Sequence, residues 1–221
     1  MRRRRRKPKH QPTTAPPGSS DNAQYPASRN IAHKPKQPRI HPWELAAIEP
    51  HLLAVEPRRT YLEIGSFLGG SLRWFSRTME AGARLISVDG DARESLNATC
   101  QEMVGAGFEM HQVTGNTQSP EIVEQVRALL SDRKVDILLI DADHSAMGVM
   151  RDIANYVPMV RKGGVAVFHD AGLNLGQFKK KYYGIHGAFN TSCVGNAVRS
   201  LATGRRSLVA STDCGTAVVW M

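Results

Sequence analysis

Two short polar motifs carry the residue types that metal and acid–base chemistry need. One is Asp-Ala-Asp-His at 141–144 and the other is His-Asp at 169–170, and each directly follows an apolar run. Clustered ionisable side chains at the end of an apolar strand are not needed for packing. Asp141 and Asp170, with His169 as a further candidate, could hold one divalent cation. Carboxylates favour Mg²⁺, whereas a histidine ligand favours Mn²⁺, Fe²⁺ or Zn²⁺.

Each motif also has a purely structural interpretation. Asp143 or His144 could cap the helix expected to begin near Ser145, because short polar side chains accept hydrogen bonds from the first turn of a helix. His169 could equally be a hydrogen-bonded histidine of the core. The residues alone leave these alternatives open.

A glycine-rich segment, Glu63–Gly70, lies between a predicted strand and a predicted helix. Glycines let the backbone approach a ligand closely, and a helix N-terminus offers unpaired N–H groups to a carboxylate. The spacing Gly-x-x-x-Gly-Gly differs from the dinucleotide fingerprint, and the Gly-Lys-Ser/Thr of a phosphate-binding loop is missing. The segment therefore favours an adenosyl ligand without a pyrophosphate, with a structural turn as the alternative.

Further polar residues follow the next two predicted strands. Asp89 stands 19 residues after Gly70, where a carboxylate can bind the two hydroxyls of a ribose. Asn116, Thr117 and Gln118 could contact an adenine edge. The alternative is that Asn116 and Thr117 only cap the next helix.

Strand and helix patterns alternate along the chain, which predicts an α/β domain with a doubly wound, mostly parallel sheet. A helix precedes the first strand, between Pro42 and Pro57, and an active-site loop or lid is expected over 171–190. The expected strands are 60–64, 85–89, 109–114, 135–141, 165–169 and an antiparallel hairpin of 207–210 with 216–220. The expected helices are 71–81, 93–104, 120–130, 146–160 and 194–201.

The positive charge is concentrated in residues 1–39, which carry eleven basic residues and one acidic residue; the rest carries 18 and 19. This segment is poor in large apolar residues, so we expect it to be a disordered tail preceding a domain at 40–221. Three widely spaced cysteines indicate a reducing compartment, namely the cytoplasm. No apolar run is long enough for a transmembrane helix or an export signal.

Taken together, the motifs resemble those of class I S-adenosylmethionine-dependent methyltransferases. Among these, the bacterial family of macrolide sugar O-methyltransferases and cephalosporin hydroxylases is the most similar, and catechol O-methyltransferase is more distantly similar. The resemblance covers about residues 42–221 and implies a seven-stranded Rossmann-like methyltransferase fold. Its segments are 61–71, 87–89, 115–118, 139–145 and 163–170.

The resemblance also implies roles for particular residues. S-adenosyl-L-methionine would be held by residues at the ends of the first four strands: Glu63, Gly65, Ser66, Gly69, Gly70, Asp89, Thr117, Gln118 and Asp141. A divalent cation, most simply Mg²⁺, would be bound by Asp141, His169 and Asp170. Related enzymes have Glu-Asp or Asp-Asn where this chain has His-Asp, so the third ligand and the metal are open.

His144 stands where the resemblance places the general base, three residues after the first metal ligand. A hydroxyl bound to a cation becomes more acidic, and a neutral imidazole can accept its proton. The sequence therefore predicts an O-methyltransferase acting on a hydroxyl of a small molecule, of sugar or natural-product type.

Two other functions fit the sequence. One is a metal-independent methyltransferase acting on another acceptor. The other is a nucleic-acid-associated protein in which residues 1–39 contact phosphates or an anionic membrane surface, although the domain lacks a basic helix or an aromatic platform. The run 179–183 (Lys-Lys-Lys-Tyr-Tyr) could clamp an acidic substrate or simply be solvated. Both a monomer and a homo-oligomer are compatible with the sequence.

Overall fold

A computed structural model describes residues 38–172, 184–185, 192–211 and 214–221. Most of the predicted tail (1–39) and most of the predicted lid (171–190) lie outside these residues. The strands are β1 (Thr60–Ile64), β2 (Arg84–Asp89), β3 (Glu109–Thr114), β4 (Val135–Ile140), β5 (Val160–Phe168), β6 (Gly184–Ile185), β7 (Ser207–Ser211) and β8 (Thr216–Trp220). The helices are α1 (Pro42–Leu53), α2 (Gly70–Ser76), α3 (Glu94–Gly105), α4 (Pro120–Leu130), α5 (Ala146–Tyr156) and α6 (Cys193–Ala202).

The described strands form one sheet with the order β3-β2-β1-β4-β5-β8-β7-β6. Strands β1 to β5 are parallel, and β8 and β7 join them as the predicted antiparallel hairpin. The order reverses between β1 and β4, the place where open α/β sheets bind ligands beyond the strand ends. The doubly wound α/β prediction is thus confirmed, with the two-residue strand β6 added at the edge.

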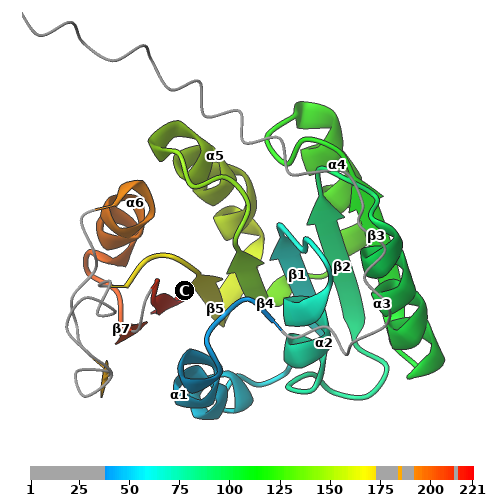
Figure 1. Cartoon of the computed structure of the whole chain (residues 1–221), viewed down its shortest axis with the longest axis horizontal. Coiled ribbons are helices and arrows are strands. Elements are labelled where there is room, and N and C mark those ends of the chain that lie inside the picture. Colours follow the sequence, from blue (N-terminus) through cyan, green and yellow to red (C-terminus); the bar gives the residue numbers. More distant parts are fainter. Residues whose placement is uncertain (1–37, 173–183, 186–191, 212–213) are drawn as a thin grey trace, which may run out of the picture. The chain divides into compact units, whose positions relative to one another are not determined.

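Helices cover both faces of the sheet (Figure 1). Leu62, Ile64 and their equivalents on the other strands pack against α4, α5 and α6. Tyr61 and its equivalents pack against α1, α2 and α3. Because side chains alternate along a strand, both cores require nearly continuous apolar strands, as the sequence shows.

Three predicted boundaries were wrong by four residues or more. Helix α2 ends at Ser76 instead of 81, where the hydroxyls of Ser76 and Thr78 donate to nearby carbonyls at 2.8 Å and compete with the helix. Helix α5 gives way to a 3₁₀ turn at Val157–Met159, because Pro158 has no N–H to donate. Strand β5 begins at Val160, where it pairs with Val135. In the part of the chain described, no helix is long and apolar enough to cross a membrane.

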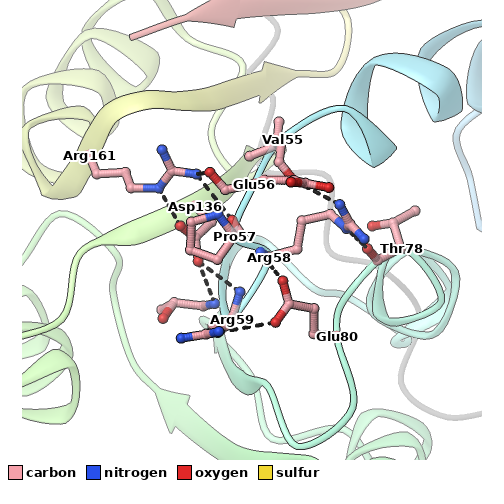
Figure 2. A network of polar contacts seen from close by, with 10 residues as sticks. Val55, Glu56, Pro57, Arg58, Arg59, Thr78, Glu80, Asp136 and Arg161 are labelled. Carbon is pink, nitrogen blue, oxygen red and sulfur yellow. Dashed lines mark hydrogen bonds and ion pairs between the residues drawn. The ribbon is translucent and has the colours of Figure 1, made fainter.

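A network of hydrogen bonds connects neighbouring strands at the amino end of the sheet (Figure 2). The buried carboxylate of Asp136, on β4, accepts hydrogen bonds from the backbone N–H groups of Arg59 and Thr60, at 2.8 and 2.9 Å, and from Arg161 at 2.5 Å. Arg161 also donates to the carbonyls of Glu56 and Pro57. One carboxylate thereby joins β4, the start of β1 and β5.

Asp136→Ala should therefore lower the free energy of unfolding by about 3 kcal/mol, because it leaves a partly buried guanidinium and two backbone donors without their acceptor. Denaturant unfolding of the full chain measures the change. Asp132→Ala removes an exposed carboxylate nearby and should change stability by less than about 0.5 kcal/mol. Equal stability of the two variants would contradict the importance of the network.

Candidate functional site

The register of the sheet brings the chemical motifs together. Ile64 pairs with Ile140, and Ile140 pairs with Phe168. The next residues along, Gly65, Asp141 and His169, therefore leave three adjacent strands at one edge. Backbone hydrogen bonds from Asp141 N–H to Ile64 and from His169 N–H to Ile140, at 2.8 and 3.3 Å, continue the pairing.

The glycine loop depends on glycine at two positions. Gly65 has φ +92°, and a Cβ there would lie 2.3 Å from the carbonyl oxygen of Asp141. Gly69 has φ +81°, and a Cβ there would lie 2.7 Å from Thr99. Side chains at these positions would be both strained and blocked. The loop then leads into α2 at Gly70, while Ser66 is buried and accepts a hydrogen bond from Ser87 at 2.7 Å.

Glu63 is fully buried at the end of β1, on the face that carries α1 to α3. Its carboxyl group accepts hydrogen bonds from Tyr61, at 3.0 Å, and from Ser71 on α2. Burial raises the pKa of Glu63 to about 8, and the charges of Asp141 and Asp89 act in the same direction. The site therefore contains a carboxyl group that is substantially protonated at neutral pH.

Asp89 organises the loop from the end of β2. Its carboxylate accepts hydrogen bonds from the backbone N–H of Phe67 at 2.6 Å and of Asp91 at 3.0 Å. It also pairs with Arg93 at 2.9 Å, and that guanidinium lies 4.7 Å from the centre of the Phe67 ring. Asp89 thus connects the glycine loop to the start of α3.

None of residues 116–118, which follow β3, is the N-cap of α4, although Asn116 Oδ1 accepts a hydrogen bond from Gln118 N–H at 3.0 Å just before that helix. The N-cap of α4 is Ser119. Thr117 instead donates its hydroxyl to the buried Asp152, at 2.9 Å, and Gln118 donates to Asp143 at 2.9 Å. Gln118 is half-buried and connects the loops that follow β3 and β4, whereas the Thr117 side chain is directed toward α5.

Two carboxylates and two imidazoles meet at the ends of β4 and β5. His144 Nε2 lies 3.3 Å from Asp141 Oδ1 and 3.1 Å from Asp170 Oδ2. His169 Nδ1 lies 3.3 Å from the same Asp141 oxygen and 3.6 Å from the same Asp170 oxygen. His144 is half exposed, whereas His169 is buried. The structure thus brings together the four residues predicted for metal binding and catalysis.

These groups shift one another's pKa values. Burial disfavours ionisation of Asp141, but hydrogen bonds and charge from His144 and His169 outweigh burial and hold its pKa below the usual value. The hydrogen bond to Asp141, with the nearby charge of Asp170, raises the pKa of His144. Burial opposes protonation of His169, but the same carboxylates raise its pKa to about 9. In this arrangement each imidazolium stabilises the carboxylates.

The backbone also favours the cluster. Asp170 has φ +56°, a left-handed conformation that is uncommon for residues other than glycine and is found most often at functional sites. It turns the chain after His169, so consecutive side chains both approach Asp141. The capping alternative fails for His144, because the helix is capped by Ser145, whose hydroxyl accepts from Gly148 at 3.0 Å. Asp143 accepts from Ser145 N–H at 2.8 Å just before the helix.

The donor atoms of this cluster fit a divalent cation. Ligand atoms of Asp141, His144 and Asp170 lie within 4.8 Å of one another, as do those of His169, Asp170 and Cys214. Mixed oxygen and nitrogen donors suit Mn²⁺ or Fe²⁺ as well as Mg²⁺. The proximity of Cys214 was not predicted, because nothing in its local sequence places the β7–β8 turn beside the end of β5.

Sequence reasoning also missed Glu44. This fully buried residue of α1 lies with Oε2 3.9 Å from His169 Nε2. Burial is the main cause that raises its pKa. A signal was present in the sequence: Glu44, Ile48 and Leu52 follow one another at intervals of four, so an acidic residue lies on the buried stripe of the helix.

Comparisons with known proteins agree with this geometry. A family model described as "Methyltransferase domain" matches residues 62–171, which include the end of β1, the whole of β4 and both polar motifs. The uncharacterized protein R132 of Acanthamoeba polyphaga mimivirus is 30% identical over 115 residues, 50% of this chain and 51% of that protein. The chain therefore spans about half the length of the curated relative that it matches.

Solved structures share the fold. An O-methyltransferase from Bacillus cereus in complex with S-adenosylhomocysteine (SAH) superposes with a TM-score of 0.58 at 16% identity, covering 86% of this chain and 84% of that one. The O-methyltransferase TomG from Streptomyces achromogenes, in complex with S-adenosylmethionine, gives 0.53 at 17% identity over 80% and 77%. MycE methyltransferase of mycinamycin biosynthesis, with Mg and SAH, gives 0.55 at 19% identity over 85% and 51%.

The family match over the glycine loop and both polar motifs, on a sheet of this order, identifies the protein's class. The chain belongs to the class I S-adenosylmethionine-dependent methyltransferases.

Proposed function

We propose that this protein methylates a hydroxyl oxygen of a small molecule, using S-adenosylmethionine and a divalent cation. The observation that carries the proposal is the convergence of His144 on Asp141 and Asp170 beside the glycine loop. We assign this methyl transfer to a domain at residues 40–221. A cytoplasmic location is proposed from the small number and wide spacing of the cysteines, Cys100, Cys193 and Cys214.

For the cofactor, the supporting features lie at the ends of β1 and β2. S-adenosylmethionine supplies an already activated methyl group. Gly65 and Gly69 let the loop turn in close contact with Asp141 and Thr99, and the backbone of this loop would hold the methionine part. Asp89, already oriented by Phe67 N–H and Arg93, would accept hydrogen bonds from the ribose hydroxyls.

For the cation, Asp141 and Asp170 would supply carboxylate oxygens, and His169 would supply Nδ1. When bound, a cation lowers the pKa of a coordinated hydroxyl. The carboxylates of Asp141 and Asp170 raise the pKa of His144 and so favour its protonated form. A divalent charge at the carboxylates would lower the pKa of His144 by electrostatic repulsion.

His144 is the proposed general base. It lies three residues beyond Asp141 and is half exposed, so its ring can face both the cation site and an incoming acceptor. A base must be neutral before it accepts a proton, and its raised pKa means that the carboxylates must first be compensated. The base and the cation are therefore parts of one proposal. MycE, whose structure contains Mg and SAH, is a precedent on the same fold.

Asp89→Ala should weaken the binding of S-adenosylhomocysteine by about 10- to 100-fold, the loss of hydrogen bonds to a charged group. Isothermal titration calorimetry measures the affinity. The matched control is Asp91→Ala, which removes an exposed carboxylate that also pairs with Arg93, at 3.5 Å. Comparable affinities for the two variants would exclude Asp89 as a ribose ligand.

His144→Ala should lower turnover by about 10²- to 10⁴-fold, the contribution of general base catalysis, while affinity for S-adenosylhomocysteine is retained. Turnover is followed as methyl transfer from labelled S-adenosylmethionine to a panel of sugar and catechol hydroxyls. His111→Ala, on β3, serves as a histidine control. Wild-type turnover in His144→Ala would remove His144 from the mechanism.

Chelation with EDTA should abolish methyl transfer to the same acceptors, and added Mg²⁺ or Mn²⁺ should restore it, because the hydroxyl loses the charge that acidifies it. Binding of S-adenosylhomocysteine should persist under chelation. Turnover that is insensitive to EDTA would favour a metal-independent methyltransferase. Methylation of RNA or DNA but of no small hydroxyl compound would favour the nucleic-acid function instead.

A further inference from the structure

A further carboxylate, that of Glu44, lies on the opposite side of His169 from Asp141 and Asp170. It belongs to α1, a helix that the proposed mechanism does not use. Glu44 is in the first turn of α1, next to Leu45 and in line with Ile48 and Leu52, all of which belong to the core beneath the sheet. Its exposed fraction is 0%. Placing a carboxylate in such a core is costly unless it is satisfied by hydrogen bonds. The partners of Glu44 therefore indicate what it does in this core.

The contacts of Glu44 fix the direction of its carboxylate. Oε2 accepts a hydrogen bond from the Thr216 hydroxyl at 2.6 Å, and Oε1 accepts one from the backbone N–H of Gly215 at 3.2 Å. Both donors come from the start of β8, which pairs with β5. Residues at the start of β8 therefore hold the Glu44 carboxylate from one side. Strand β8 pairs with β5, and His169 directly follows β5.

On the other side, Glu44 faces His169. Oε2 is 3.9 Å from His169 Nε2, whereas the opposite ring nitrogen, Nδ1, faces Asp141 and Asp170 at 3.3 and 3.6 Å. The ring is buried, with 8% exposure, so it is packed between these groups. The ring is thus oriented with Nδ1 toward the two carboxylates of the cation site and Nε2 toward Glu44, the arrangement in which a carboxylate on the far side fixes the orientation of a ligating histidine.

We propose that Glu44 is a positioning residue, which holds His169 with Nδ1 directed into the cation site and thereby makes this histidine a metal ligand. The inference rests on the proposed metal-assisted function and extends it to α1. A histidine that ligates a metal commonly donates its other N–H to a carboxylate, and loss of that partner weakens metal binding. It also gives a reason for a carboxylate among Leu45, Ile48 and Leu52.

The first test measures Mn²⁺ affinity of the full chain by electron paramagnetic resonance of the free ion. Glu44→Gln keeps the size of the side chain and an acceptor for Thr216, but removes the charge near Nε2. It should weaken Mn²⁺ binding by about 10- to 100-fold. Glu49→Gln, a carboxylate on the same helix, should leave the affinity unchanged. Thr216→Val, which removes one support of Glu44, should give a smaller loss in the same direction.

The second test identifies the ligand, using the ¹⁴N modulation of the Mn²⁺ echo that a coordinated imidazole produces. It is recorded in His144→Ala, so that His144 cannot contribute. The modulation should be present in His144→Ala and lost when Glu44→Gln is added. Thermal unfolding of each variant shows that the fold is retained.

The outcomes separate the two proposals. Mn²⁺ bound with equal affinity by Glu44→Gln and wild type, or a nitrogen modulation that survives the added Glu44→Gln, would overturn the role of Glu44 and leave metal-assisted methylation standing. Mn²⁺ bound without any nitrogen modulation in His144→Ala would do the same. A wild-type chain that binds no Mn²⁺ at all would overturn the metal proposal together with this inference.

Discussion

Two carboxylates and two imidazoles at the ends of β4 and β5 favour one another's charged forms, and the rest of the candidate site is arranged around them. Asp141 is ionised in spite of its burial because His144 and His169 approach one of its oxygens at 3.3 Å. The two carboxylates raise the pKa values of both imidazoles, that of His169 to about 9. A divalent cation at these carboxylates would stabilise their negative charge in place of the imidazoles. It would thereby favour the neutral form of His144, which can act as a base.

This cluster depends on the pairing of β1, β4 and β5. Alternation along the strands puts Glu63, Asp141 and His169 on the same face of the sheet as α1, α2 and α3. That face brings Glu44 of α1 to the far side of His169 and Ser71 of α2 to Glu63. The close approach of β1 to β4 also requires Gly65, since a Cβ would overlap the Asp141 carbonyl. A shift of one residue in register would bury the wrong side chains and disperse the site.

The polar groups at the two ends of the sheet differ in how they are compensated. At the amino end, Asp136 and Arg161 satisfy backbone groups of the connection into β1, and every partner of Asp136 is a donor (Figure 2). At the carboxyl end, the carboxyl groups of Glu63, Asp89 and Asp141 lie near one another, and burial together with these charges raises the pKa of Glu63. Carboxylates brought together in this way are unfavourable for folding, so the network at the opposite end helps to offset that cost.

The sequence by itself determined the α/β class, most strand positions and the two polar motifs, because continuous apolar strands and the polar residues that end them are local patterns. It placed Asp141, His144, His169 and Asp170 correctly at strand ends, and could not choose between capping and chemistry for them. Only the tertiary structure decided that Ser145 is the cap, that Thr117 is directed to Asp152, and that Glu44 faces His169. The last two contacts join residues that are far apart in the chain, and they arise from sheet register and helix packing, which no local pattern encodes.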